Sequence, residues 1–418
     1  MQLKTILNRI EKFKSFVYGK VRLVEEAGRL TLLVEVIARA NGQATCSKCG
    51  HRRPGYDTQW SPRRFEYVPL WGIAVFFLYT MRRVSCPTCG VVVESVPWAE
   101  GKETLTRTYR WFLARWAKRL SWKEVAEAFH TTWEHVFRSV RMAVQWGLAH
   151  RDLDGITAVG VDEVQFHRGH QYLTLVYQIN DGCKRLLWVG KERTAKTLLR
   201  FFRWLGPKRS ATLRFICSDM WQPYLKVIAR KAKQALNVLD RYHIAAKINK
   251  AIDKVRAQEA KDLAAKGYEP VLKHSRWCLV KRPEHLTPAQ DVKLRELVKY
   301  NLKSVRAYLL KEDLQFFWDY KDRFWAKRYL LDWCTRVIRS RLEPLKQVAR
   351  SLREHLPLIM NWFNARGVIS LGAVEGLNNK EKLIMRKSYG FRTYEAAEIA
   401  LYHTMGDLPV PQRTHSFC

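Results

Sequence analysis

Acidic residues occur at three places in this sequence where a strand or a helix is expected to begin or end. The first is the pair Asp162 and Glu163 in TAVGVDEVQFHRGHQ, the second is Asp219 in TLRFICSDMW, and the third is Glu375 in SLGAVEGLNNK. A buried carboxylate is costly unless it is paired, hydrogen-bonded or bound to a metal ion. Three carboxylates that reach one point could hold two Mg²⁺ ions about 3.5–4 Å apart, an arrangement suited to phosphodiester chemistry.

Each of these acidic residues also has a purely structural explanation. Asp162 or Glu163 could form a salt bridge within a basic sheet. Asp219 could cap the helix that follows it, and Glu375 could face solvent on its own helix. Strand alternation places Asp162 and Glu163 on opposite faces, so the pattern alone does not choose between them.

Two C-x-x-C pairs, CSKCG and CPTCG, indicate a structural zinc site. The short loop of each pair aims two thiolates at one ion, and the glycine that follows relieves the tight turn. The pairs are separated by 36 residues, so a β-hairpin is expected between them. His51 could compete as a ligand, but four cysteines already complete the site, and the alternative is four free cysteines. The expected ligands are Cys46, Cys49, Cys86 and Cys89.

The segment LSWKEVAEAFHTTWEHVFRSVRMAVQWGL predicts a helix-turn-helix. Ser121 with Glu124 three residues later forms a capping box, and Thr132 can cap the second helix after the break at HTT. The second helix would enter the major groove of DNA, with Arg138 and Arg141 as candidate contacts. An ordinary helical hairpin is the alternative. The expected buried face of the second helix consists of Val136, Val140 and Val144.

The charge of the chain favours a polyanionic partner. The formal net charge is +35 over 418 residues, with +12 in residues 1–150, +11 in 151–250, +10 in 251–360 and +2 in 361–418. Lys and Arg that neutralise phosphates release condensed counterions, which makes a polyanion the natural partner. A basic but merely solvated surface is the alternative.

The remaining composition points to a folded cytoplasmic protein. The 47% hydrophobic content argues against global disorder. No apolar run approaches about 18 residues, so no transmembrane helix is expected. The N-terminal residues lack a secretory signal. Nine cysteines, an odd number, favour a reducing cytosol over a disulfide framework.

Hydrophobic periodicity divides the chain into regions of different type. Residues 15–100 are expected to be β-rich, 103–150 helical and 250–360 almost wholly helical, whereas strands and helices alternate over 156–240. The expected order in the alternating region is three antiparallel strands, a helix, a strand, a helix, a strand and a helix. The three antiparallel strands are expected at 156–166, 170–179 and 184–190.

From about Ile156 onward the chain resembles the DDE transposases of bacterial insertion sequences, in particular the ISL-three family. The matching stretches are VGVDEVQFHRGHQYLTLVYQI, SDMWQPYLKVI, VLDRYHIAAKINKAIDKVR and GAVEGLNNKEKLIMRKSYGFRTYEAAEIALY, and the cysteine pairs and helix-turn-helix fall where that family has them. The resemblance implies that Asp162, Asp219 and Glu375 form the catalytic triad and bind two Mg²⁺ or Mn²⁺ ions. Asp240 and His243 are expected near the metals, although a helix-capping Asp and a satisfied His are equally consistent with the sequence.

The resemblance implies an α/β multidomain protein with an RNase H-like catalytic core. Its parts are expected to be a β-rich zinc-binding module, a helix-turn-helix module, the first part of the core, an α-helical insertion, and the end of the core with the C-terminal tail. The corresponding ranges are 1–100, 101–153, 154–258, 259–362 and 363–418.

The expected activity is cleavage and strand transfer at the terminal inverted repeats of a transposon, joining them to target DNA. A homodimer on DNA and a location in the bacterial cytoplasm, at the nucleoid, are expected. The first alternative is a DNA-binding regulator or a domesticated, catalytically silent derivative, which would not need all three carboxylates. The second is a structure-selective nuclease of the same fold, which would not need two DNA-reading modules.

Overall fold

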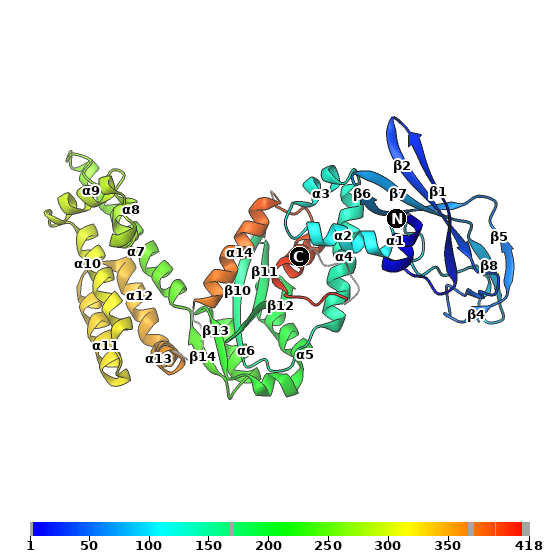
Figure 1. Ribbon diagram of the computed structural model, residues 1–418. Coiled ribbons are helices and arrows are strands. Elements are labelled where there is room, and N and C mark those ends of the chain that lie inside the picture. Colours follow the sequence, from blue (N-terminus) through cyan, green and yellow to red (C-terminus); the bar gives the residue numbers. More distant parts are fainter. Residues whose placement is uncertain (1–2, 168–170, 367–371, 389, 412–418) are drawn as a thin grey trace. The chain divides into compact units, whose positions relative to one another are not determined.

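The computed structural model describes residues 3–167, 171–366, 372–388 and 390–411 (Figure 1). The chain forms two compact units. The first combines residues 1–152 with 382–418, and the second comprises residues 153–381. This division is coarser than the five expected ranges, which stay predictions.

A four-stranded sheet forms most of the β-rich part of the first unit. Its strand order is β1-β2-β7-β6, and β1 and β2 are joined by a tight turn in which Ala27 and Gly28 have φ of 52° and 72°. Trp98 is buried on this sheet and contacts the rings of Phe16 and Tyr79 at centroid distances of 4.9 and 5.3 Å. The strands are Phe16–Glu26 (β1), Arg29–Ala38 (β2), Arg63–Leu70 (β6) and Ile73–Tyr79 (β7), and helix α1 (Leu3–Ile10) precedes them.

The cysteine pairs lie on two smaller sheets, β3-β4 and β5-β8-β9. The expected hairpin between the pairs is present as β6–β7. It does not belong to the small sheets, because β7 pairs with β2 and so joins the large sheet. The small-sheet strands are Ala44–Thr45 (β3), Arg52–Arg53 (β4), Gly55–Thr58 (β5), Arg82–Cys86 (β8) and Gly90–Val93 (β9).

Four helices complete the first unit, and the expected helix-turn-helix caps are confirmed. Ser121 and Glu124 form a complete capping box, and the Thr132 hydroxyl accepts a hydrogen bond from the His135 amide. The three expected valines are buried, because the second helix, α4, packs against α2, α3 and α15. The helices are Arg107–Trp116 (α2), Trp122–Ala128 (α3), Trp133–His150 (α4) and Tyr394–Met405 (α15).

The second unit contains a five-stranded mixed sheet of order β12-β11-β10-β13-β14. The first three strands are antiparallel neighbours, as expected from the sequence, and β13 and β14 run parallel to β10. The strands are Ala158–His167 (β10), Gln171–Asn180 (β11), Cys183–Lys191 (β12), Phe215–Ser218 (β13) and Leu236–Leu239 (β14).

Helices cover both faces of this sheet (Figure 1). On one face α5 (Ala195–Thr212) and α6 (Gln222–Lys231) bury an apolar core that includes Val159 and Val161. On the other face lies α14 (Ala373–Lys387), which approaches β10 closely at Gly160. A Cβ on Gly160 would lie 2.4 Å from the Val374 side chain, so only glycine permits this packing.

The region between β14 and α14 is almost entirely helical, as expected, and α7 (Arg241–Ala265) leads into it (Figure 1). Buried Glu259 on α7 accepts hydrogen bonds from the Lys303 and Ser304 amides at the start of α10, which ties these two helices together. Among the described residues no helix is both long and apolar enough to cross a bilayer. The other helices are Arg276–Val280 (α8), Pro283–His285 (η1), Pro288–Val298 (α9), Lys303–Gln315 (α10), Phe316–Asp319 (η2), Arg323–Arg339 (α11), Glu343–Glu354 (α12) and Leu356–Ala365 (α13).

The described residues therefore form a mixed α/β protein with a β-rich N-terminal region and a helical C-terminal part, which confirms the expected fold class at that level.

Candidate active site and zinc site

Parallel strand pairing brings three aspartates of the second unit to one level across neighbouring strands, and this cluster is called the acidic edge. Gly160 on β10 pairs with Cys217 on β13, so Asp162 lies level with Asp219, two residues further along each strand. Ser218 pairs with Leu239 on β14, so Asp219 is in turn level with Asp240. Three neighbouring parallel strands thus bring an aspartate to the same height, from the middle of β10 and from directly after the ends of β13 and β14.

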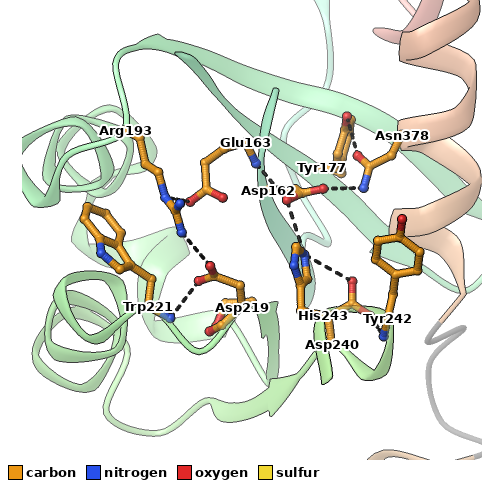
Figure 2. Close-up of polar contacts among 11 residues, drawn as sticks. Asp162, Glu163, Tyr177, Arg193, Asp219, Trp221, Asp240, Tyr242, His243 and Asn378 are labelled. Atoms are coloured by element: carbon orange, nitrogen blue, oxygen red, sulfur yellow. Dashed lines mark hydrogen bonds and ion pairs between the residues drawn. The ribbon is translucent and has the colours of Figure 1, made fainter. Parts of the chain in front are cut away.

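Asp162 faces the side of the sheet that α14 covers (Figure 2). The side chain is buried, and its Oδ2 accepts a hydrogen bond from the Asn378 amide, whose oxygen accepts one from the Tyr177 hydroxyl at 3.1 Å. Oδ1 accepts the Glu163 backbone N–H at 2.8 Å. Asn378 lies three residues after Glu375, so α14 presents both side chains on neighbouring parts of one helical face.

Glu163 faces the opposite side of the sheet, which α5 and α6 cover (Figure 2). Its Oε1 lies 3.1 Å from Nε of Arg193, and Arg193 donates a second contact of 2.7 Å to Oδ2 of Asp219. Burial, followed by the charge of Asp219, raises the pKa of Glu163 to about 8 in spite of Arg193. Near neutral pH Glu163 is therefore mostly protonated, and Asp219 is the main charged partner of Arg193.

Asp219 is held on both of its oxygens. Oδ1 accepts the backbone N–H of Trp221 at 2.9 Å, while Oδ2 accepts from Arg193. The Arg193 guanidinium also lies over the Trp221 ring, 4.7 Å from its centroid. These contacts place Asp219 in the loop that follows β13, before α6 begins.

Asp240 and His243 lie beside Asp162, and both structural roles considered for them are observed. Asp240 caps α7 by accepting the Tyr242 backbone N–H at 2.8 Å. Nε2 of His243 lies 3.4 Å from Oδ1 of Asp162 and 3.9 Å from Asp240. Burial alone would lower the pKa of His243, but the hydrogen bond and charge of Asp162, together with the charge of Asp240, raise it overall.

Glu375 is exposed at the start of α14. Burial raises the pKa of Asp240, and the negative charge of Glu375 raises it further. The two carboxylates therefore interact electrostatically. Among the described residues, the four cysteine sulfurs lie within 4.8 Å of one another, whereas the carboxylate oxygens of this site form no such cluster. The donor set nevertheless suits magnesium, which prefers carboxylate oxygens.

The four expected zinc ligands lie together in the first unit, with their sulfur atoms within 4.8 Å of one another. The first pair is shaped by hydrogen bonds from the Cys46 amide to the His51 carbonyl and from the Gly50 amide to the Cys46 carbonyl. Gly50 and Gly90 follow the two pairs with φ of 72° and 75°, as tight turns require. His51 contributes a backbone carbonyl here, and four thiolates match a closed tetrahedral zinc site.

Both candidate DNA-contacting arginines of α4 are engaged inside the first unit. Arg138 forms an ion pair with Glu103, and its backbone carbonyl accepts from Arg110. Arg141 lies 3.2 Å from Glu395 on α15. The exposed residues near the start of α4 are Trp133 and Glu134.

Two family models match parts of this chain. A transposase family model, DDE_Tnp_ISL3, matches residues 159–401, which include the acidic edge and α14. A second model, described as the zinc-finger of transposase IS204/IS1001/IS1096/IS1165, matches residues 42–89, which contain all four cysteines. The chain belongs to the ISL3 family of DDE transposases.

Two curated relatives extend the similarity over almost the whole chain. The transposase for insertion sequence element IS1001 of Bordetella parapertussis is 28% identical over 90% of this chain and 93% of that protein. The transposase for IS1557 of Mycobacterium tuberculosis is 28% identical over 91% of each. The expected family and the expected insertion-sequence transposase function are thereby confirmed, and the four-cysteine cluster in a matched zinc-finger segment supports a structural zinc.

Two residues of this transposase's acidic edge were missed by the sequence analysis. Arg193 lies in the KERTAKT turn between β12 and α5, with no periodicity that marks it as different from other arginines. Asn378 lies in the quoted EGLNNK stretch, three residues after Glu375, and that helical spacing was a usable signal.

Proposed function

We propose that this transposase cuts and joins DNA with a triad of Asp162, Asp219 and Glu375 in an RNase H-like core. The alignment of Asp162, on the central strand β10, with Asp219, directly after the neighbouring parallel strand β13, carries the proposal. The Asn378 hydrogen bond, which ties the helix of Glu375 to Asp162, supports the third member. The strand order, with three antiparallel strands followed by two strands parallel to the first, supports the core assignment.

The proposal also distinguishes Asp162 from Glu163. Asp162 shares its face of the sheet with α14, which carries Glu375, whereas Glu163 points to the opposite face, toward Arg193. Divalent ions bound by the triad would supply activation of the attacking oxygen and stabilisation of the leaving oxygen. Asn378 and the Trp221 amide orient the carboxylates of Asp162 and Asp219.

We further propose that the N-terminal unit reads the terminal inverted repeats and that two chains act together on the two ends. The helix-turn-helix arrangement, the zinc module and the positive charge support end binding. Arg138 and Arg141 would have to exchange Glu103 and Glu395 for DNA in order to make the expected contacts. The exposed start of α4, around Trp133, is the part of that helix open to the groove without such an exchange.

Substitution of the triad tests the proposal. Asp162→Asn, Asp219→Asn and Glu375→Gln should each lower Mg²⁺-dependent nicking of an element-end duplex by at least about 10³-fold, because a metal ligand supplies several kcal/mol at the transition state. Binding of the same duplex in Ca²⁺ should change little. Asp181→Asn, in the exposed turn between β11 and β12, is the matched control.

The same assay separates the alternatives. Near wild-type nicking by one of the three variants would remove that residue from the triad. A wild-type protein that binds the ends but never nicks them would indicate a silent, regulatory derivative. Nicking without preference for the end sequence would indicate a nuclease.

A further inference from the structure

The acidic edge contains a cation of the protein itself. The Arg193 guanidinium contacts two carboxylates at once, those of Glu163 and Asp219 (Figure 2). The Asp219 contact is a hydrogen bond of 2.7 Å, whereas Nε of Arg193 approaches Glu163 at 3.1 Å without hydrogen-bond geometry. Asp219 is therefore the more direct partner.

This contact competes with the role proposed for Asp219. Its Oδ1 accepts the neutral Trp221 amide, whereas its Oδ2 accepts the charged Arg193 guanidinium, so a metal ion at Oδ2 would have to share that oxygen with a cation. Arg193 and a divalent ion carry charge of the same sign and cannot both lie against one oxygen without a large electrostatic cost. A metal ion that takes Oδ2 must displace Arg193.

Arg193 keeps other contacts once a metal ion displaces it from Asp219. The guanidinium is stacked over the Trp221 ring, and its Nε lies 3.1 Å from Oε1 of Glu163, so Arg193 stays beside the site. A third of its side chain is exposed, compared with 13% for Asp219, so its outer N–H groups can reach a ligand in solvent. A DNA phosphate is the ligand whose geometry and charge match a freed guanidinium at this position.

We propose that Arg193 is exchanged between two partners: it neutralises Asp219 before metal binds, and metal binding releases it to donate to a DNA phosphate. Arg193 is thus a metal-gated DNA ligand beside the triad, and it makes metal binding precede full engagement of the DNA. This inference rests on the proposed triad, because Asp219 must be a metal ligand for the exchange to occur.

Metal affinity is measured first, on the zinc-loaded full chain without DNA, by calorimetric titration with Mn²⁺. Arg193→Gln should bind Mn²⁺ about fivefold more tightly than wild type, the effect of removing a partly exposed ion pair that competes for Asp219. Arg193→Lys should fall between the two, because an ammonium keeps the charge but loses the planar fork and the ring stacking. Arg203→Gln, an exposed change of equal charge on α5, is the control and should match wild type.

DNA affinity is measured second, on the zinc-loaded chain with one labelled element end, in buffer without added divalent ions and in Ca²⁺. Arg193→Gln should bind like wild type without added divalent ions, where Arg193 is occupied by Asp219. In Ca²⁺ it should bind roughly five- to tenfold more weakly, which is the loss of one charge-assisted hydrogen bond. Arg203→Gln should show the same ratio to wild type in both conditions.

The outcomes separate the exchange from simpler roles. Unchanged or weaker Mn²⁺ binding by Arg193→Gln and Arg193→Lys would overturn the competition and leave Arg193 as a residue that orients Asp219. An equal loss of DNA affinity with and without added Ca²⁺ would overturn the gating. The proposed triad itself fails if Asp219→Asn binds Mn²⁺ as well as wild type does, or if wild type binds none. If wild type does bind such an ion and Arg193→Gln matches it, only the exchange fails.

Discussion

The cysteine site brings four sulfur atoms within 4.8 Å of one another, whereas the acidic edge keeps its carboxylates apart with other side chains between them. Arg193 stands between Glu163 and Asp219, His243 lies against Asp162 and Asp240, and Asn378 donates to Asp162. Protonated thiols are neutral and can gather without a metal ion. Ionised carboxylates repel one another and need counter-charges where no metal ion holds them.

The two sites also differ in how the chain builds them. Each cysteine pair lies in one short loop, so local turns place two ligands at once. The proposed triad carboxylates of the second unit come from three separate elements, β10, the loop after β13 and α14, and depend on tertiary packing. The cysteine site is therefore expected to govern folding of its module, and the acidic edge to govern chemistry in a unit that folds without it.

Removal of one zinc-binding thiolate should have the largest effect, because the fold of the zinc module depends on that site. Cys86→Ser should unfold the zinc module, because structural zinc supplies on the order of 10 kcal/mol to such small modules. End binding should weaken with it, while the second unit stays folded. Zinc content by elemental analysis and hydrogen exchange resolved by peptide would measure both effects.

Cys183→Ser, at the start of β12, is the matched control and should keep its zinc. Freshly purified wild-type protein with no zinc would contradict the assignment. So would a Cys86→Ser protein whose residues 42–89 exchange as slowly as those of wild type.

Mild acid should act on the two units in opposite directions. Burial, with the charge of Lys118, lowers the pKa of His403 in α15 to about 3, below the value of about 6.5 in an unfolded chain. Its contribution to stability is present above about pH 6.5 and is lost at about 1.4 kcal/mol per pH unit below it. The raised pKa of Glu163 has the reverse sign, since its contribution is present in acid and is lost as the pH rises through about 8.

Hydrogen exchange at pH 7.5, 6.5 and 5.5, corrected for intrinsic rates, would test this contrast. Protection of α4 and α15 should fall toward pH 5.5, and protection of β10 should not. His403→Leu should flatten the response of α15 while leaving any acid loss of zinc unchanged. An unaltered pH response in His403→Leu would show that the histidine is not the source.

Asn378 should contribute to chemistry and little to folding. Asn378→Ala removes the donor to Asp162 and the acceptor for Tyr177, so nicking should fall about tenfold, in the range seen when partners of metal ligands are removed. The half-saturating Mg²⁺ concentration should rise. Tyr177→Phe should have a smaller effect in the same direction.

Asn379→Ala, the exposed neighbour on α14, is the control and should leave nicking unchanged. If Asn378→Ala lowers nicking with no change in Mg²⁺ dependence, Asn378 does not act through the orientation of Asp162.

The sequence predicted the elements that local patterns determine. Alternation around Asp181 and Gly182 identified the antiparallel strands, and Ser121 with Glu124 identified a helix start, because each depends on neighbours in the chain. It did not predict Arg193, whose role depends on the position of Asp219, 26 residues away. Nor did it predict that Arg138 would be paired with Glu103, 35 residues away. The residues around an arginine in the sequence do not show whether its side chain faces solvent or a distant carboxylate.

The smallest expected effect concerns the charge of the helical region before α14. Arg323 and Lys327 lie one turn apart on α11 and are exposed, so they can reach phosphates without leaving a buried site. If both contact DNA, replacing them with Gln should lower the slope of log K against log salt by about 1.8, at roughly 0.9 per phosphate. The loss should be equal on element ends and on scrambled DNA, because phosphate contacts carry no sequence information. Titration of both DNAs over a salt series would measure it, with Lys4→Gln, on α1 of the first unit, as a further comparison. An unchanged slope would mean that these cations face only solvent, and a loss confined to the element end would mean that α11 takes part in reading sequence.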